Sequence, residues 1–117
     1  MTARHQVILF LIMMKNAAAN QFVLTHRRKN LATLATLGLD LGDAKERVMG
    51  LTPEDYVEGP DPDDKRPGDE VWVFGLEIGG QEVYVKVCVL SEPLLCTCIS
   101  FHLADRPLKY PLRARAR

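Results

Sequence analysis

The spacing of the apolar residues changes once along the chain, and this change sets the fold class. In the first half, Leu31, Leu34 and Leu37 lie three residues apart, a spacing that places apolar side chains on one face of a helix. From Val83 to Val89, valine occupies every second position, which is the pattern of a strand with one buried face. A helical pattern followed by a strand pattern predicts an α+β fold, with N-terminal helices packed on one face of a C-terminal antiparallel β-sheet.

The length of the chain favours a single domain. A chain of 117 residues is long enough to bury one core and too short for two domains of ordinary size. We expect a helical part over about residues 5–58, an acidic loop over 59–69, a β-meander over 70–102 and a basic C-terminal tail over 103–117.

Capping and turn signals place the elements inside these parts. Helices are predicted over residues 6–16, from Asn30 to a stop at Gly38, and over 44–49 after a cap at Asp40 or Asp43. One more short helix is predicted after Thr52-Pro53. The segment 21–25 is expected to be extended or linking. The pair Gly79-Gly80 predicts a hairpin turn between strands 70–78 and 81–90, and a third strand covers 94–101.

Charge is unevenly distributed although the formal net charge is zero. Residues 1–50 carry seven basic and three acidic side chains, residues 51–70 carry two and eight, and residues 71–117 carry six and four. The overall charge therefore says little about partners, and a basic face can still attract an anion.

The N-terminal apolar run and the cysteines bear on the location of the protein. The run from Val7 to Met14 is far short of the roughly 20 residues that span a bilayer. The chain shows no secretion signal and has an odd number of cysteines, three, which favours reduced thiols in the cytoplasm. We expect the first helix to be buried in the core or under a partner chain, which makes homo-oligomer formation through it a candidate interaction.

Alternation along the second strand separates a core face from a polar face. The valines from Val83 to Val89 are expected to lie against the helices that carry Leu34 and Leu37, which leaves Tyr84, Lys86 and Cys88 on the other face. On the third strand, the same rule assigns Leu95, Ile99 and Phe101 to the core face, and Cys96, Cys98, Ser100 and His102 to the polar face.

Strand pairing about the turn at Glu92 brings four polar residues of the two strands together. It pairs Tyr84 with Ser100 or His102, and Lys86 with Cys98 or Ser100. A phenol, an ammonium, a hydroxyl and an imidazole suit the cleavage of a phosphodiester without metal, through a general base, a cation and a general acid. The same residues also fit a solvated strand face on which His102 caps a carbonyl.

Cysteine and histidine on one face raise the alternative of a zinc site. On a flat strand, however, the thiols of Cys96 and Cys98 would be roughly 7 Å apart, whereas zinc sites more often use Cys-x-x-Cys turns. Asp61, Asp63 and Asp64 lack the downstream spacing of a calcium loop. We expect no metal and no cofactor.

Several short sequence motifs, in order along residues 27–111, resemble one branch of the MqsR-like toxin family. They are RRKNL (27–31), LGL (37–39), LTPEDY (51–56), GP (59–60), VWVFG (71–75), EVYVKV (82–87), CISFH (98–102) and PLKYP (107–111). The resemblance implies a RelE-like fold and the toxin of a type II toxin-antitoxin system. Such a toxin is a metal-independent endoribonuclease that cleaves mRNA, inhibits translation and is silenced by a cognate antitoxin protein. The competing class is a non-catalytic RNA- or protein-binding module that uses the same sheet face.

The resemblance also implies catalytic residues. The family's functional tyrosine matches Tyr84, the lysine of the same strand word matches Lys86, and a functional lysine falls on His102. Another lysine of the family falls near Glu58, and the glutamine that follows the family's tryptophan falls on Val73. This sequence therefore departs from the family's pattern at these two positions. We expect the catalytic residues His102, Tyr84 and Lys86, with RNA bound by Ser100, Arg106, Lys109 and Arg113.

Overall fold

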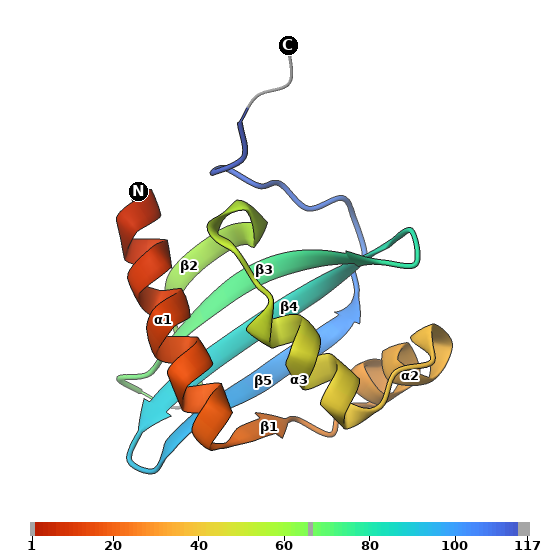
Figure 1. Cartoon of the computed structure of the whole chain (residues 1–117), viewed down its shortest axis with the longest axis horizontal. Helices are drawn as coiled ribbons and strands as arrows, with labels where there is room; N and C mark the ends of the chain where they lie inside the picture. Colours follow the sequence, from red (N-terminus) through yellow and green to blue (C-terminus); the bar gives the residue numbers. More distant parts are fainter. Residues whose placement is uncertain (1, 66, 115–117) are drawn as a thin grey trace.

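The fold is built on a five-stranded mixed sheet with helices on one face (Figure 1). The computed structural model describes residues 2–65 and 67–114. Strands β3 (Glu70–Ile78), β4 (Gln81–Ser91) and β5 (Leu94–Leu103) form the predicted antiparallel meander in the middle of the sheet order β1-β5-β4-β3-β2. Gly79 and Gly80 turn the β3–β4 hairpin with φ values of 60° and 78°, as the Gly-Gly pair predicts.

Two edge strands extend the sheet beyond the predicted meander, and the first of them lies in residues 21–25, which were expected to be extended or linking. Strand β1 (Phe22–Leu24) runs parallel to β5, so the sheet is mixed and not purely antiparallel. Strand β2 (Tyr56–Pro62) pairs with β3 and replaces both the end of the predicted helix and the start of the predicted loop. Of that helix, only the 3₁₀ turn η1 (Pro53–Asp55) is present. An edge strand tolerates proline because one of its sides needs no backbone donors.

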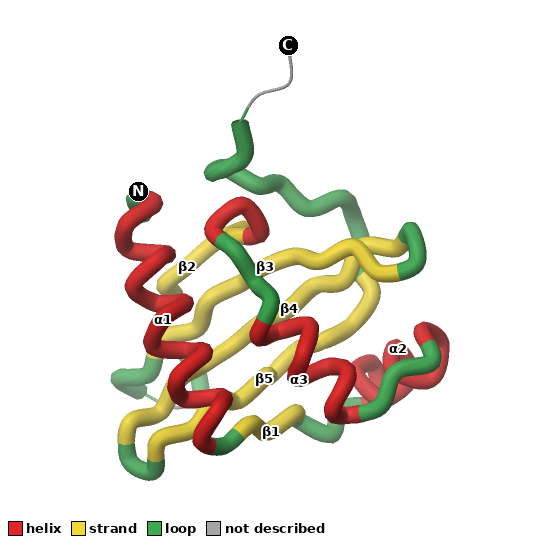
Figure 2. The backbone as a smooth tube through the Cα atoms, in the orientation of Figure 1, coloured by secondary structure: helices red, strands yellow, loops and turns green. Residues whose placement is uncertain are grey.

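Three helices were predicted correctly in position, with boundaries shifted by a few residues. Helices α1 (Arg4–Asn20), α2 (Arg28–Leu37) and α3 (Leu41–Met49) precede the meander. Gly38, with φ 68°, ends α2, and the side chain of Asp40 caps α3. Helices α1 and α3 cross one face of the sheet, which we call the inner face, whereas α2 lies at the edge beside β5 (Figure 2). The opposite face is the outer face.

The valines of β4 form the centre of the core on the inner face. Val83, Val85 and Val87 are fully buried, as alternation predicted. Their main cover is α1, whose Phe10 stacks on Trp72 with ring centroids 4.4 Å apart. The helix that carries Leu34 and Leu37, which was expected to be this cover, packs only at the margin of the core.

Helix α1 is apolar on both of its sides. Its outward side exposes Ile8, Leu9, Ile12 and Met13, each between 39% and 61% accessible. A homo-oligomer contact through this side stays a prediction. Among the residues that the structure describes, no helix is long and apolar enough to cross a membrane.

Helix α2 docks on the edge of β5 through a buried polar side chain. Strand β1 ends at Leu24, so the edge of β5 beyond that point has no strand to pair with. Asn30, fully buried, takes its place: its Nδ2 donates to Thr25 O at 2.8 Å and to Ile99 O at 3.0 Å, and its Oδ1 accepts from Phe101 N at 2.9 Å. The amide side chain therefore acts as a short substitute for β1.

The segment that Asn30 binds contains a β-bulge. Lys86 pairs with Ser100 and Val87 pairs with Cys98, which leaves Ile99 as an extra residue in β5. A bulge shifts the alternation of a strand by one residue. Consequently Cys96 and Cys98 are core residues on the inner face, and the prediction that they share the face of Ser100 and His102 was wrong. The matching assignment of Leu95 and Ile99 to the core was also wrong, whereas Phe101 is in the core as predicted.

Replacing Asn30 by alanine tests this docking. Asn30→Ala removes three hydrogen bonds and leaves buried backbone groups unpaired, so we expect the free energy of unfolding to fall by about 3 kcal/mol. Urea denaturation followed by circular dichroism measures the loss. Asn16→Ala, at an exposed position of α1, is the matched control and should change stability by less than about 0.5 kcal/mol. Equal stability of the two variants would contradict the role assigned to Asn30.

Candidate functional site

Four of the predicted site residues meet on the outer face as two adjacent cross-strand pairs. Tyr84 pairs with His102, and Lys86 pairs with Ser100. Side chains directly opposite each other on antiparallel strands lie about 5 Å apart at Cβ. The structure therefore brings together the phenol, ammonium, hydroxyl and imidazole that alternation and register had grouped.

The imidazole of His102 is fixed by two contacts. Its ring stacks on Tyr84 with centroids 5.2 Å apart and an interplanar angle of 16°. Its Nδ1 lies 3.0 Å from Leu103 O. Since a carbonyl oxygen only accepts, Nδ1 carries the hydrogen, and in the neutral ring Nε2 is left as the proton acceptor. His102 thus caps a carbonyl, as the alternative interpretation expected, and still presents a basic nitrogen.

The phenol of Tyr84 lies in surroundings that keep it protonated. Partial burial raises its pKa first, and the negative charges of Glu58 and Asp61 raise it further. A phenol with a raised pKa donates a hydrogen bond or a proton near neutral pH and is a poor base. Tyr84 and His102 therefore differ in role, one as a donor and the other as an acceptor.

Arg27 belongs to this site, although the sequence indicated it only as part of a basic cluster. It is the N-cap residue that immediately precedes α2, and its Nη1 lies 3.4 Å from the hydroxyl of Ser100, which is 3% exposed. Within the described part of the chain, neither Arg27 nor Lys86 forms an ion pair with a carboxylate. Both cations are therefore available to an anionic ligand.

The two positions at which the sequence departs from the toxin family lie in the same region. Glu58 pairs with Val73 across β2 and β3, and Val73 pairs with Lys86 across β3 and β4. These residues form a row beside the Tyr84–His102 pair. At this row, a carboxylate and an apolar side chain occupy positions that the resemblance associates with a lysine and a glutamine.

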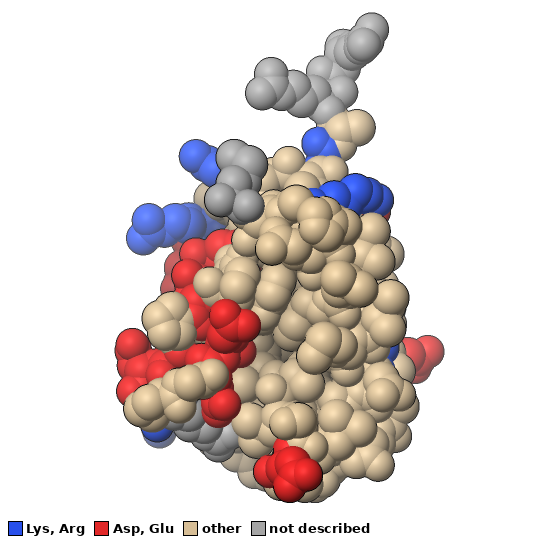
Figure 3. All heavy atoms as spheres, turned by 90° about the vertical axis from the view of Figure 1, so that its left-hand side faces the viewer, with Lys and Arg blue, Asp and Glu red and all other residues tan. Residues whose placement is uncertain are grey.

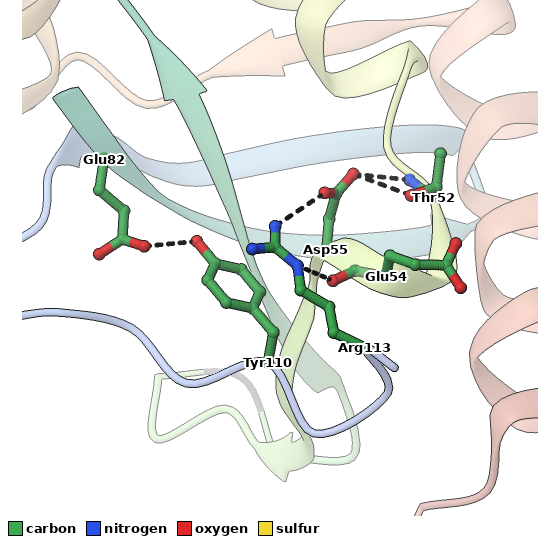
Figure 4. A network of polar contacts seen from close by, with 6 residues as sticks. All are labelled: Thr52, Glu54, Asp55, Glu82, Tyr110 and Arg113. Atoms are coloured by element: carbon green, nitrogen blue, oxygen red, sulfur yellow. Dashed lines mark hydrogen bonds and ion pairs between the residues drawn. The ribbon is translucent and has the colours of Figure 1, made fainter. Parts of the chain in front are cut away.

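The C-terminal tail lies over the sheet. Residues 104–114, which we call the C-terminal strap, run from the end of β5 toward η1 (Figure 1). Tyr110 donates its hydroxyl to Glu82 at 2.7 Å, and Arg113 stacks on the Tyr110 ring while its Nε donates to Glu54 O at 3.0 Å and its Nη2 lies 3.7 Å from Asp55 (Figure 4).

These contacts affect the predicted RNA-binding residues of the tail. Arg113 is held by the strap's own contacts, and no contact joins it to Ser100 in the described structure. Arg106 and Lys109 are exposed. RNA binding by these three residues stays a prediction, and Arg115 and Arg117 lie outside the described residues.

Gly75 gives the strap its place on the outer face. It pairs with Tyr84 across β3 and β4, and a Cβ at this position would collide with Tyr110 Oη and with Leu108 Cδ1. The strap therefore borders the Tyr84–His102 pair at one end.

A methyl group at Gly75 should displace the strap. In Gly75→Ala the collision forces Tyr110 and Leu108 off the sheet, so trypsin should cleave after Lys109 and Arg113 at least about fivefold faster, because local opening controls proteolysis. Gly50→Ala, where an added Cβ makes only ordinary contacts, is the control. Unchanged cleavage in Gly75→Ala, measured by mass spectrometry, would show that the strap is not held there.

The cysteines do not form the zinc site that the sequence had raised as an alternative. Cys96 and Cys98 are buried on the inner face, away from His102. Burial raises the pKa of the Cys96 thiol to about 12, and raises the pKa of Cys98 as well. Both thiols are therefore protonated near neutral pH and pack as small apolar side chains in the core.

A different group has potential metal ligands close together. One carboxylate oxygen each of Asp63 and Asp69 and the Sγ of Cys88 lie within 4.8 Å of one another, the one such group found in residues 2–65 and 67–114. Three mixed oxygen and sulfur ligands fall short of the four ligands of a closed structural zinc site. The group shows where a cation could bind on the outer face and implies no chemistry by itself.

The outer face carries opposite charges at its two edges. Beyond β5, the exposed side chains of Arg27, Arg28 and Lys29 lie at the N-terminal end of α2. At the other edge, β2 and the loop after it carry the acidic residues Glu58, Asp61, Asp63 and Asp64. Viewed from the side of α1 and β2, Asp and Glu gather on one flank beside a large uncharged surface (Figure 3). An anionic ligand is therefore attracted to the α2 edge.

Comparison with known proteins does not identify the family. No protein-family model matches the sequence, and a search of the curated proteins finds no significant match. The likeness to MqsR-like toxins therefore stays a resemblance carried by short sequence words.

Proposed function

We propose that the protein is an endoribonuclease that cleaves RNA on the outer face of the sheet without a metal ion, as the toxin of a type II toxin-antitoxin system. The observation that carries this proposal is the stacked Tyr84–His102 pair next to Lys86, with Arg27 beside Ser100. The cluster supplies a proton acceptor, a proton donor and two cations, which is the full set that phosphodiester cleavage by a 2′-hydroxyl requires.

Each residue has one step in the proposed reaction. His102 Nε2 takes the proton of the 2′-hydroxyl, whose oxygen attacks the adjacent phosphorus. Lys86 and Arg27 stabilise the extra negative charge on the phosphorane oxygens. Tyr84, which stays protonated because of its raised pKa, gives its proton to the leaving 5′-oxygen. The products are a 2′,3′-cyclic phosphate and a 5′-hydroxyl end.

The rest of the proposal follows from the resemblance. It supports mRNA as the substrate, translation as the process that is inhibited, a RelE-like fold and a cytoplasmic location with an antitoxin as partner. The α+β architecture with N-terminal helices and a C-terminal sheet is compatible with that fold. The competing proposal, a binding module without catalysis, is favoured by the acidic Glu58 and the apolar Val73, which add no catalytic group to the row of Lys86.

Substitution of His102 separates these two functions. We expect His102→Ala to lower RNA cleavage by about 10²-fold or more, the usual contribution of a positioned base, while RNA binding changes little. In His102→Lys, cleavage should stay low if the residue moves a proton, because a lysine is already protonated near neutral pH. If the residue only neutralises phosphate charge, lysine should restore most of the activity. Cleavage of a labelled RNA is followed in EDTA by gel electrophoresis.

Two controls accompany this experiment: one removes a different histidine, and the other checks that each variant is folded. His5→Ala removes an exposed imidazole from α1, on the opposite side of the sheet, and should cleave as the unmodified chain does. Circular dichroism verifies folding of each variant. If the unmodified chain binds RNA but does not cleave it, the binding module is the correct function, and full activity of His102→Ala would remove His102 from the mechanism.

A further inference from the structure

A pocket on the outer face lies directly beside the proposed catalytic pairs. It has a volume of about 440 Å³, within the range of about 300–1,000 Å³ that small-ligand sites occupy. Lys86 forms part of its wall, so the pocket begins where the Lys86–Ser100 pair ends. Its floor is Cys88, Thr97 and Ile99. The next pair along the strands, Cys88 with Thr97, lies roughly 7 Å from Lys86 and Ser100, because two strand residues rise by that amount.

The pocket is polarised across the strands. Arg27, from the start of α2, and Lys86 supply positive charge on one side. The loop after β2 lines the other side with Asp63 and Asp64, and also with Lys65. Ile99, the extra residue of the bulge, gives the floor an apolar surface. The pocket therefore joins a cationic wall, a floor with the apolar side chain of Ile99, and a wall that carries two carboxylates beside Lys65.

We infer that this pocket holds the nucleotide that flanks the cleaved phosphodiester, and that its carboxylates select a base with an exocyclic amino group over uracil. The inference rests on the proposed function in taking RNA as the ligand. A nucleotide has the same polarity as the pocket: an anionic phosphate at one end, a flat apolar ring, and a hydrogen-bonding base edge at the other end. A purely anionic ligand would be repelled by Asp63 and Asp64.

The carboxylates determine the choice of base. An ionised carboxylate only accepts hydrogen bonds. The amino groups of adenine, cytosine and guanine donate to it, whereas uracil presents carbonyl oxygens on either side of its single N–H group. Splayed bases of single-stranded RNA are read on this edge, and a well-made pair discriminates by roughly tenfold or more.

Binding of nucleoside 3′-monophosphates tests the pocket without requiring cleavage. The full chain is titrated in EDTA with 3′-AMP, 3′-CMP, 3′-GMP and 3′-UMP by isothermal calorimetry. We expect the three amino-bearing nucleotides to bind about tenfold more tightly than 3′-UMP. The double variant Asp63→Asn with Asp64→Asn should lose this preference, since an amide both donates and accepts. Glu70→Gln, in the same acidic segment but not lining the pocket, should keep it.

A second variant separates the phosphate contact from the base contact. Arg27→Met should weaken all four nucleotides by a similar factor, because a phosphate contact carries no information about the base. Equal affinity for the four nucleotides, or a preference that survives in the double asparagine variant, would overturn the inference. Discrimination that appears only after Zn²⁺ is added would also overturn it, in favour of a cation held by Asp63, Asp69 and Cys88.

The inference and the proposed function can fail separately. If the nucleotides are discriminated as expected and RNA is not cleaved, the pocket stands and the endoribonuclease does not. If RNA is cleaved at the same rate whichever base flanks the bond, and 3′-UMP binds as tightly as the others, the endoribonuclease stands and the pocket does not select bases.

Discussion

The outer face depends on one buried amide. Asn30 binds the carbonyl of Ile99 and the N–H of Phe101 at the point where β5 loses its parallel neighbour. The bulge at Ile99 decides which residues of β5 point outward. Without it, Ser100 and His102 would share the face of Cys98, and they would lie in the core. A polar side chain of α2 thus fixes the alternation that places the proposed catalytic residues in register with β4.

Much of the fold could be predicted from local patterns. The alternating valines identified the inner face of β4, Gly79 and Gly80 identified the hairpin, and Gly38 ended α2 as expected. These features depend on residues close together in the chain. The pairs Tyr84–His102 and Lys86–Ser100 were among the alternatives that pairing about the turn at Glu92 allowed, and the bulge at Ile99 is what selects them.

What could not be predicted depends on contacts between distant residues. The bulge in β5 is held by a residue about 70 positions away, so strict alternation assigned Cys96, Cys98, Leu95 and Ile99 to the wrong faces. Strands β1 and β2 are short or proline-containing edge strands whose pairing comes from the sheet and not from their own propensity. Arg27 joined the site only because α2 docks beside β5, and its sequence neighbours gave no sign of that.

Both ends of the described chain are fastened to the same short turn. Near the N-terminus, Arg4 forms an ion pair with Glu54, and near the C-terminus, Arg113 donates to the backbone of Glu54 and lies close to Asp55. The turn η1 therefore contacts both α1 and the strap, at the point where β2 begins. A fusion or truncation at either end of the chain therefore changes contacts to the same turn, which lies directly before β2.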